Sequence, residues 1–190
     1  MRFQQLFNKI DQLIQHKESV IVAIDGKSAA GKTALGDLLK ETYSCNVISM
    51  DSFFLRPSLM TPERFAEPGG NIDYERFFEE VITPLKSGKP FAYRPYDCKT
   101  AELTAPINVD PGPLSVIEGV YSMHPDFIGM YDITVFMTID KDFQLRRLQE
   151  RNPQLLKRFI NSWIPMENMY FEHFRIPEKC DFIFDCEEKK

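Results

Sequence analysis

VIVAIDGKSAAGKTALGDLL, residues 20–39, joins an apolar β-branched run to a glycine-containing loop and then to a pattern with helical spacing. The run at 19–25 is typical of a strand buried on both faces, and residues 33–43 are expected to form a helix. The spacing G-x-x-x-x-G-K-[ST] is met by Gly26, Gly31, Lys32 and Thr33. In a strand–loop–helix context this spacing is typical of a loop that binds phosphate groups. The plainer alternative is an ordinary turn between a strand and a helix.

The loop has the chemistry that a triphosphate needs. In this motif successive backbone N–H groups point inward around the β-phosphate, and the following helix adds the positive end of its dipole. We expect Lys32 to reach the β- and γ-phosphates and the Thr33 hydroxyl to bind Mg²⁺. The loop residues expected to contact the nucleotide are Gly26, Lys27, Ser28, Ala29, Ala30, Gly31, Lys32, Thr33 and Ala34.

The composition limits the other functions open to the chain. Its 190 residues suffice for one domain with a sizeable core, and the net charge of −5 argues against a nucleic-acid partner. No stretch approaches the roughly 18 apolar residues of a membrane span, and the first residues lack the apolar centre of a secretory signal. The four cysteines form no CxxC pair and match no zinc pattern. We therefore expect a cytoplasmic protein with reduced thiols.

The rest of the chain alternates strand-like runs with helical patterns. After an amphipathic N-terminal helix, further strands are expected at 45–50, 114–119, 133–140 and 180–185, and helices at 74–88, 141–152 and most of 153–176. This alternation predicts an α/β domain with a parallel sheet. Residues 55–73 hold three prolines and a Gly-Gly pair, and loops of this length are often functional. The aromatic and methionine series from Trp163 to Phe171 has helical spacing and is expected to lie in the core.

Two carboxylates follow predicted strands. Asp51 comes after the second strand and Glu118 ends the third. Because a parallel sheet binds ligands at the carboxyl ends of its strands, we expect both side chains to face the phosphate loop. Phosphoryl transfer needs a cation and a group that orients or deprotonates the attacking hydroxyl, and these two acids could divide those roles. The alternatives are a helix or turn cap for Asp51 and a solvated strand end for Glu118.

Seven segments together resemble the uridine kinase/phosphoribulokinase group of P-loop small-molecule kinases. They occur in the family order over nearly the whole chain: GKSAAGKT, MDSFF, NIDYERF, YRPYDC, VIEGVY, LRRLQERN and FRIPEKCDFIF. The resemblance implies a three-layer α/β/α P-loop fold with a five-stranded parallel sheet of order 2-3-1-4-5. It also implies a single domain over 1–190, with an acceptor-binding insert at about 55–110 and a lid at about 142–160.

The same resemblance implies roles for individual residues. Asp51 matches the acid beside the acceptor hydroxyl and the metal, and Glu118 matches an acid associated with Mg²⁺. Asp73 matches a carboxylate that accepts hydrogen bonds from the ribose 2′- and 3′-hydroxyls, although it could equally cap the helix at 74–88. The remaining residues implied for the acceptor pocket are Phe54, Arg94, Tyr96 and Asp97.

Three arginines fall where the family carries its basic lid. The resemblance implies that Arg147 and Arg151 act on the transferring phosphoryl group and that Arg146 binds the nucleotide. A closed lid would also exclude water and limit wasteful hydrolysis of ATP. A plain basic helix face is the alternative.

These observations predict an ATP- and Mg²⁺-dependent kinase that phosphorylates a primary hydroxyl of a small molecule, with a nucleoside as the favoured acceptor. Uridine-cytidine kinases carry a pyrimidine-contacting histidine after the YD segment, whereas residues 96–105 contain none. Nicotinamide riboside, a pantothenate-like vitamin or a sugar phosphate are therefore alternative acceptors. A nucleotide-binding regulatory module without an acceptor is the alternative outside enzymes. The sequence indicates no nucleic-acid or membrane partner and leaves homo-oligomerisation open.

Overall fold

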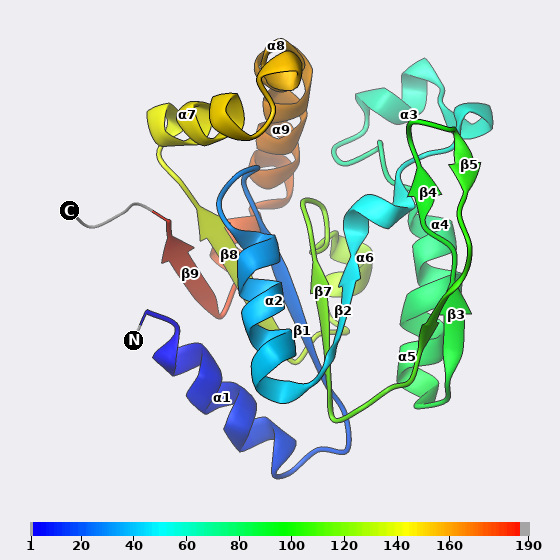
Figure 1. The fold of residues 1–190 in the computed structure, drawn as a ribbon, viewed down its shortest axis with the longest axis vertical. Helices are drawn as coiled ribbons and strands as arrows, with labels where there is room; N and C mark the ends of the chain where they lie inside the picture. Colours follow the sequence, from blue (N-terminus) through cyan, green and yellow to red (C-terminus); the bar gives the residue numbers. More distant parts are fainter. Residues whose placement is uncertain (1, 187–190) are drawn as a thin grey trace.

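The computed structural model describes residues 2–186 of the chain, and its centre is a parallel sheet (Figure 1). The strands of this sheet are β1 (Val20–Gly26), β2 (Asn46–Ser49), β7 (Leu114–Glu118), β8 (Ile133–Thr138) and β9 (Phe182–Asp185). The order across the sheet is β2-β7-β1-β8-β9, and every neighbouring pair is parallel. Counted along the chain among these five strands, the order is 2-3-1-4-5, which confirms the predicted topology.

Helices cover both faces of the sheet, so the predicted three layers are present. One face is covered by α1 (Gln4–Ile14) and α2 (Lys32–Tyr43). The opposite face is covered by α4 (Tyr74–Phe77), η3 (Phe78–Ile82), α5 (Thr83–Ser87), α6 (Pro125–Ile128) and α9 (Ile164–Phe174). Successive residues of β1 point to opposite faces: Val22 packs in the cluster under α1, and Ala23 packs in the cluster that includes Phe77.

The remaining elements lie in two segments. The segment between β2 and β7 contains η1 (Met50–Phe53), η2 (Pro57–Leu59), α3 (Pro62–Ala66), β3 (Phe91–Tyr93), β4 (Tyr96–Asp97), β5 (Glu102–Leu103) and β6 (Ile107–Val109). The segment after β8 contains α7 (Lys141–Arg151), η4 (Pro153–Leu155), α8 (Leu156–Arg158), η5 (Phe159–Trp163) and η6 (Ile176–Lys179). None of the helices in the described part of the chain is long and apolar enough to cross a membrane.

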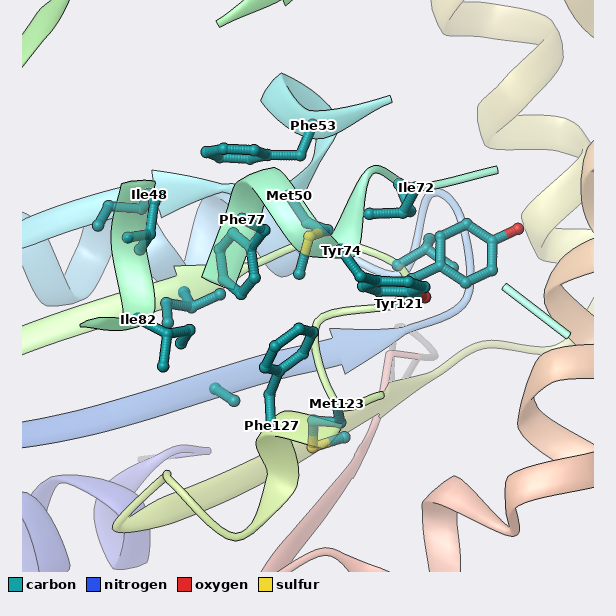
Figure 2. Close-up of a cluster of buried hydrophobic side chains, with 14 of the residues drawn as sticks. Ile48, Met50, Phe53, Ile72, Tyr74, Phe77, Ile82, Tyr121, Met123 and Phe127 are labelled. Atoms are coloured by element: carbon teal, nitrogen blue, oxygen red, sulfur yellow. The ribbon is translucent and has the colours of Figure 1, made fainter. Parts of the chain in front are cut away.

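A cluster of aromatic and aliphatic side chains attaches the 50–82 segment to the sheet (Figure 2). Phe77 lies at its centre, with ring centroids 5.1 Å from Phe53 and 5.2 Å from Phe127, both in edge-to-face geometry. Met50 and Phe53 are fully buried in this cluster. Because both ends of η1 are anchored, the turn that carries Asp51 is fixed at the carboxyl end of β2.

Candidate active site

The phosphate loop follows β1 directly, as predicted. Gly26 has a φ of +136° and Gly31, the N-cap of α2, a φ of +94°. A Cβ on Gly26 would lie 2.1 Å from the carbonyl oxygen of Met137 in the neighbouring strand. Glycine is therefore required at position 26 both by its backbone angle and by the close approach of β8.

Lys32 lies across this loop and is only 8% exposed. Its Nζ donates hydrogen bonds to the carbonyl oxygens of Gly26, at 2.8 Å, and Lys27, at 3.0 Å. The ammonium group is thus held inside the loop, at the position where a phosphate-binding lysine is needed.

The two predicted carboxylates meet beside the loop. Ser49 of β2 pairs in register with Glu118 of β7, so both strands end at the same edge of the sheet. Glu118 Oε2 accepts a hydrogen bond of 3.2 Å from the Thr33 hydroxyl. Burial raises the pKa of Glu118 above its ordinary value. Asp51 is open to the cavity but enclosed by protein at longer range, and this enclosure raises its pKa while Lys32 and Arg151 oppose the shift.

A cavity of about 790 Å³ joins the loop to these acids. Its aromatic wall consists of Phe54, Tyr121, Phe159 and Trp163. The structure brings together the following residues that the sequence predicts for the site: Ser28, Ala29, Gly31, Lys32, Thr33, Ala34, Asp51, Phe54, Glu118, Arg147 and Arg151. Trp163 was expected in the core, and its position in the cavity wall corrects that expectation.

The donor set fits a magnesium ion. The Thr33 hydroxyl and the Glu118 carboxylate supply adjacent hard oxygen atoms, and Asp51 lines the same cavity. Within residues 2–186 no group of three or more His, Cys, Asp or Glu side chains forms a metal cage. Such a sparse protein set suits Mg²⁺, which usually keeps several waters and binds substrate phosphates.

Asp73 is not brought to this cavity. It lines a second cavity of about 750 Å³, where Oδ1 caps α4 by accepting the Arg76 backbone N–H at 3.1 Å. Its Oδ2 lies 3.3 Å from a guanidinium nitrogen of Arg56 and 3.7 Å from Nε of Arg76. The start of α4 needs a cap and the buried arginine needs a counter-ion, so the carboxylate is already engaged. The helix-cap alternative therefore describes its geometry.

The other residues predicted for the acceptor pocket also lie elsewhere. Arg94 donates hydrogen bonds to the carbonyl oxygens of Leu103 and Thr104, both at 2.8 Å. Tyr96 is buried and pairs with Leu103, and Asp97 Oδ1 accepts the Lys99 N–H at 2.8 Å. These contacts hold the β4–β5 hairpin together, which explains why the side chains do not face the cavity. Their neighbour Cys98 lines it instead.

The three arginines predicted for the lid separate in the structure. Arg147 and Arg151 line the cavity, and Arg147 donates to the carbonyl oxygen of Ala29 at 3.1 Å. Arg146 does not line it, and its guanidinium lies 4.9 Å from the ring centroid of Phe143. The geometry therefore places two of the three near the phosphate loop.

Two buried acids beside the loop were not predicted. Asp25 is fully buried and accepts hydrogen bonds from the N–H groups of Gly26 and Met123, at 2.7 and 3.0 Å, and from the Tyr170 hydroxyl, at 2.9 Å. Burial raises its pKa to about 6 although these donors oppose the shift. Glu167 lines the cavity and contacts Ser28. A charged residue at the end of an apolar strand was a sequence signal for Asp25, whereas Glu167 carries none.

Comparisons with known proteins agree with this architecture. No protein-family model matches the chain. The uridine kinase of Lactococcus lactis is 25% identical over 174 residues, which cover 82% of this chain and 84% of that protein. The inorganic pyrophosphatase TTM2 of Arabidopsis thaliana is also 25% identical over 174 residues, but these are 85% of this chain and only 25% of that protein. A solved structure, named a possible uridine kinase from Bacillus stearothermophilus, superposes with a TM-score of 0.69 at 21% identity and covers 95% of this chain and 100% of that one.

These findings confirm the P-loop kinase fold and the predicted resemblance to uridine kinase-like proteins. They support a small-molecule kinase as the general class of the protein. The acceptor has to be argued from the cavity.

Proposed function

We propose that this protein transfers the γ-phosphate of ATP to a primary hydroxyl of a small molecule, with a nucleoside as the favoured acceptor. The observation that carries the proposal is that the phosphate loop and Asp51 line one cavity. A nucleotide-binding module without an acceptor needs no carboxylate and no aromatic wall beside its phosphate loop. The names of the curated relatives support the same class.

Positioning and electrostatics supply most of the catalysis in phosphoryl transfer. Lys32 is placed to stabilise charge on the β- and γ-phosphates, and Arg147 and Arg151 are placed to act on the transferring group from α7. Asp51 orients the acceptor hydroxyl and takes its proton. Its raised pKa brings the carboxyl nearer to neutral pH, which favours proton transfer.

Thr33 and Glu118 would hold Mg²⁺, with Asp51 nearby. When bound there, the ion would neutralise charge that develops on the phosphate oxygens. The hydrogen bond between Thr33 and Glu118 keeps both oxygen atoms at the same side of the loop. Arg146 is expected to contribute to nucleotide binding only if α7 moves, because its guanidinium packs on Phe143.

The aromatic wall favours an acceptor that carries a ring. Phe54 and Tyr121 lie on elements from the sheet edge, and Phe159 and Trp163 lie on η5. Flat apolar surfaces on two sides suit a nucleobase, which stacks on aromatic side chains. Nicotinamide riboside satisfies the same requirement. Pantothenate-like vitamins and sugar phosphates have no aromatic ring and use this wall less well.

An acceptor panel tests the proposal. Purified protein is incubated with ATP, Mg²⁺ and one of uridine, cytidine, nicotinamide riboside, pantothenate or fructose 6-phosphate. The release of ADP is measured above the background without acceptor. We expect a riboside to give the largest increase and Asp51→Asn to abolish it while binding of ATP persists. No increase with any acceptor, together with intact ATP binding, would favour the regulatory module.

A further inference from the structure

Helix α9 contacts the phosphate loop through a buried carboxylate. Glu167 is only 4% exposed. Its Oε2 accepts the backbone N–H of Ser28 at 3.0 Å, and its Oε1 accepts the Ser28 hydroxyl. One side chain thus binds both donors of a residue in the middle of the loop.

Other contacts hold the same part of the loop. Gln144 of α7 donates to the carbonyl oxygen of Ser28 at 3.0 Å, and Arg147, one turn later, donates to that of Ala29 at 3.1 Å. One turn beyond Glu167, Tyr170 donates to Asp25 at 2.9 Å. The outer rim of the loop is therefore held by α7, which lies in the predicted lid, and by α9, which follows it.

We infer that Glu167 is a positioning residue for phosphoryl transfer, which acts by holding Ser28 and so fixing the phosphate loop against α9. This inference rests on the proposed function. Glu167 is far from Ser28 in sequence but adjacent in space, so it links the helices that surround the lid to the loop that binds phosphate.

The chemistry of the contact argues for positioning rather than simple packing. A buried carboxylate is costly unless donors surround it, and here both donors come from the loop. A negative charge beside an anion-binding loop also opposes phosphate binding. The charge is therefore unhelpful to binding, whereas the two hydrogen bonds order the loop before the nucleotide arrives.

Glutamine separates these two effects. Glu167→Gln keeps an oxygen for the Ser28 N–H and an amide for the Ser28 hydroxyl, but it removes the charge. Glu167→Ala removes the hydrogen bonds as well. Glu172→Ala, on an exposed position of the same helix, is the matched control. Ser28→Ala removes only the hydroxyl from the loop side and serves if Glu167→Ala does not fold.

Three measurements are made on each full-length variant: hydrogen exchange of the peptide containing residues 26–31, the affinity for ADP, and kcat and KM for ATP. For Glu167→Ala we expect faster loop exchange and a tenfold to hundredfold loss in kcat/KM, the size for lost hydrogen bonds to a charged group. ADP affinity should fall by about tenfold in the same variant. Glu167→Gln should stay within about threefold of the wild type, and Ser28→Ala should fall between the two.

Two results would overturn the inference. If Glu167→Ala matches Glu172→Ala in loop exchange and ADP affinity, the carboxylate does not position the loop. If Glu167→Gln is as impaired as Glu167→Ala, the charge itself is required and the group acts on the reacting atoms instead. Exchange and ADP affinity need no acceptor, so the inference is tested even if the acceptor panel fails. A wild-type protein that does not bind ADP would refute the proposed function, and the exchange data alone would then decide the inference.

Discussion

At the scale of single residues, Lys32 has the most direct chemical role. Its ammonium is already held between two loop carbonyl oxygens, so little reorganisation is needed when phosphates bind. Lys32→Ala removes this cation, and we expect turnover to fall by roughly a hundredfold or more. Turnover with ATP, Mg²⁺ and the best acceptor of the panel is the measurement. Lys40→Ala, at an exposed position of α2, is the control. A native circular dichroism spectrum with turnover within a few-fold of the wild type would contradict the role of the loop.

Asp25 makes stability depend on pH. Burial raises its pKa from 3.8 to about 6 in the folded state, so the native protein binds this proton more tightly than the unfolded chain does. Protonation therefore stabilises the fold, and that stabilisation is lost as the pH rises through the window from about 4 to about 6. At about 1.36 kcal/mol per pKa unit, the whole change amounts to roughly 3 kcal/mol.

Asp25→Asn cannot take up this proton. We expect the free energy of unfolding of the wild type, relative to the variant, to fall by roughly 2–3 kcal/mol between pH 4 and pH 7. Urea unfolding of both proteins at four pH values across this range is the measurement. Tyr170→Phe, which removes one donor to the carboxyl, should shift the window to higher pH. Parallel pH profiles for wild type and Asp25→Asn would show that another group titrates.

At the scale of elements, the unit formed by β1, the loop and α2 could be predicted from sequence because its signals are local. The apolar run, the two glycines and the helical spacing all lie within 20 residues, and each element forms where its pattern predicts. Gly26 shows why: its positive φ and its contact with Met137 are properties of the strand–loop junction itself.

Gly26→Ala tests this junction. The new Cβ would meet the backbone of Met137 at 2.1 Å, and alanine disfavours a φ of +136°. Because neither strand can shift without breaking the sheet, we expect a loss of roughly 3 kcal/mol or more in the free energy of unfolding. Gly129→Ala is the control, since that glycine has a negative φ and no atom within 4 Å of the added group. Equal urea midpoints for the two variants would contradict the steric argument.

The helices after β8 show the limit of local patterns. Helical spacing predicts the helices themselves, and Tyr170 and Phe171 are buried as expected. It does not predict which face of α9 meets the phosphate loop, because that face is decided by packing between segments far apart in the chain. Glu167 is therefore invisible as a site residue in the sequence, and Trp163 is assigned to the core although it lines the cavity.

At the scale of the whole molecule, the sheet topology and the central site were predictable, but the acceptor side was not. Residues directly after strand ends, such as Asp51 and Glu118, are placed by the parallel sheet itself. Asp73 lies in a long insert, and its side chain can face either of two cavities on opposite sides of the segment that pairs Phe54 with Ile72. The balance between capping α4, pairing with arginines and facing the ligand depends on tertiary packing, which no spacing rule captures.

The two placements of Asp73 make opposite predictions for its replacement. If its carboxylate held a ribose diol, Asp73→Ala would erase the preference for a riboside over its 2′-deoxy analogue, because the unpaired site group causes that discrimination. In the structure the carboxylate instead caps α4 and faces Arg56 and Arg76. We therefore expect the ratio of kcat/KM for uridine and 2′-deoxyuridine to be unchanged in Asp73→Ala. The free energy of unfolding should fall by roughly 1–3 kcal/mol, since a cap and a buried counter-ion are lost together.

Asp73→Asn distinguishes the two losses, because asparagine caps helices well but carries no charge for the arginines. We expect it to recover about half of the lost stability, as measured by urea unfolding. A ratio that collapses towards one in Asp73→Ala, with unfolding unaffected, would contradict the structural placement. The insert would then have to rearrange when the acceptor binds, so that Asp73 leaves Arg56 and Arg76 and joins Asp51 in the first cavity. An unchanged ratio, with reduced stability, would locate ribose recognition among the residues that line that cavity with Asp51.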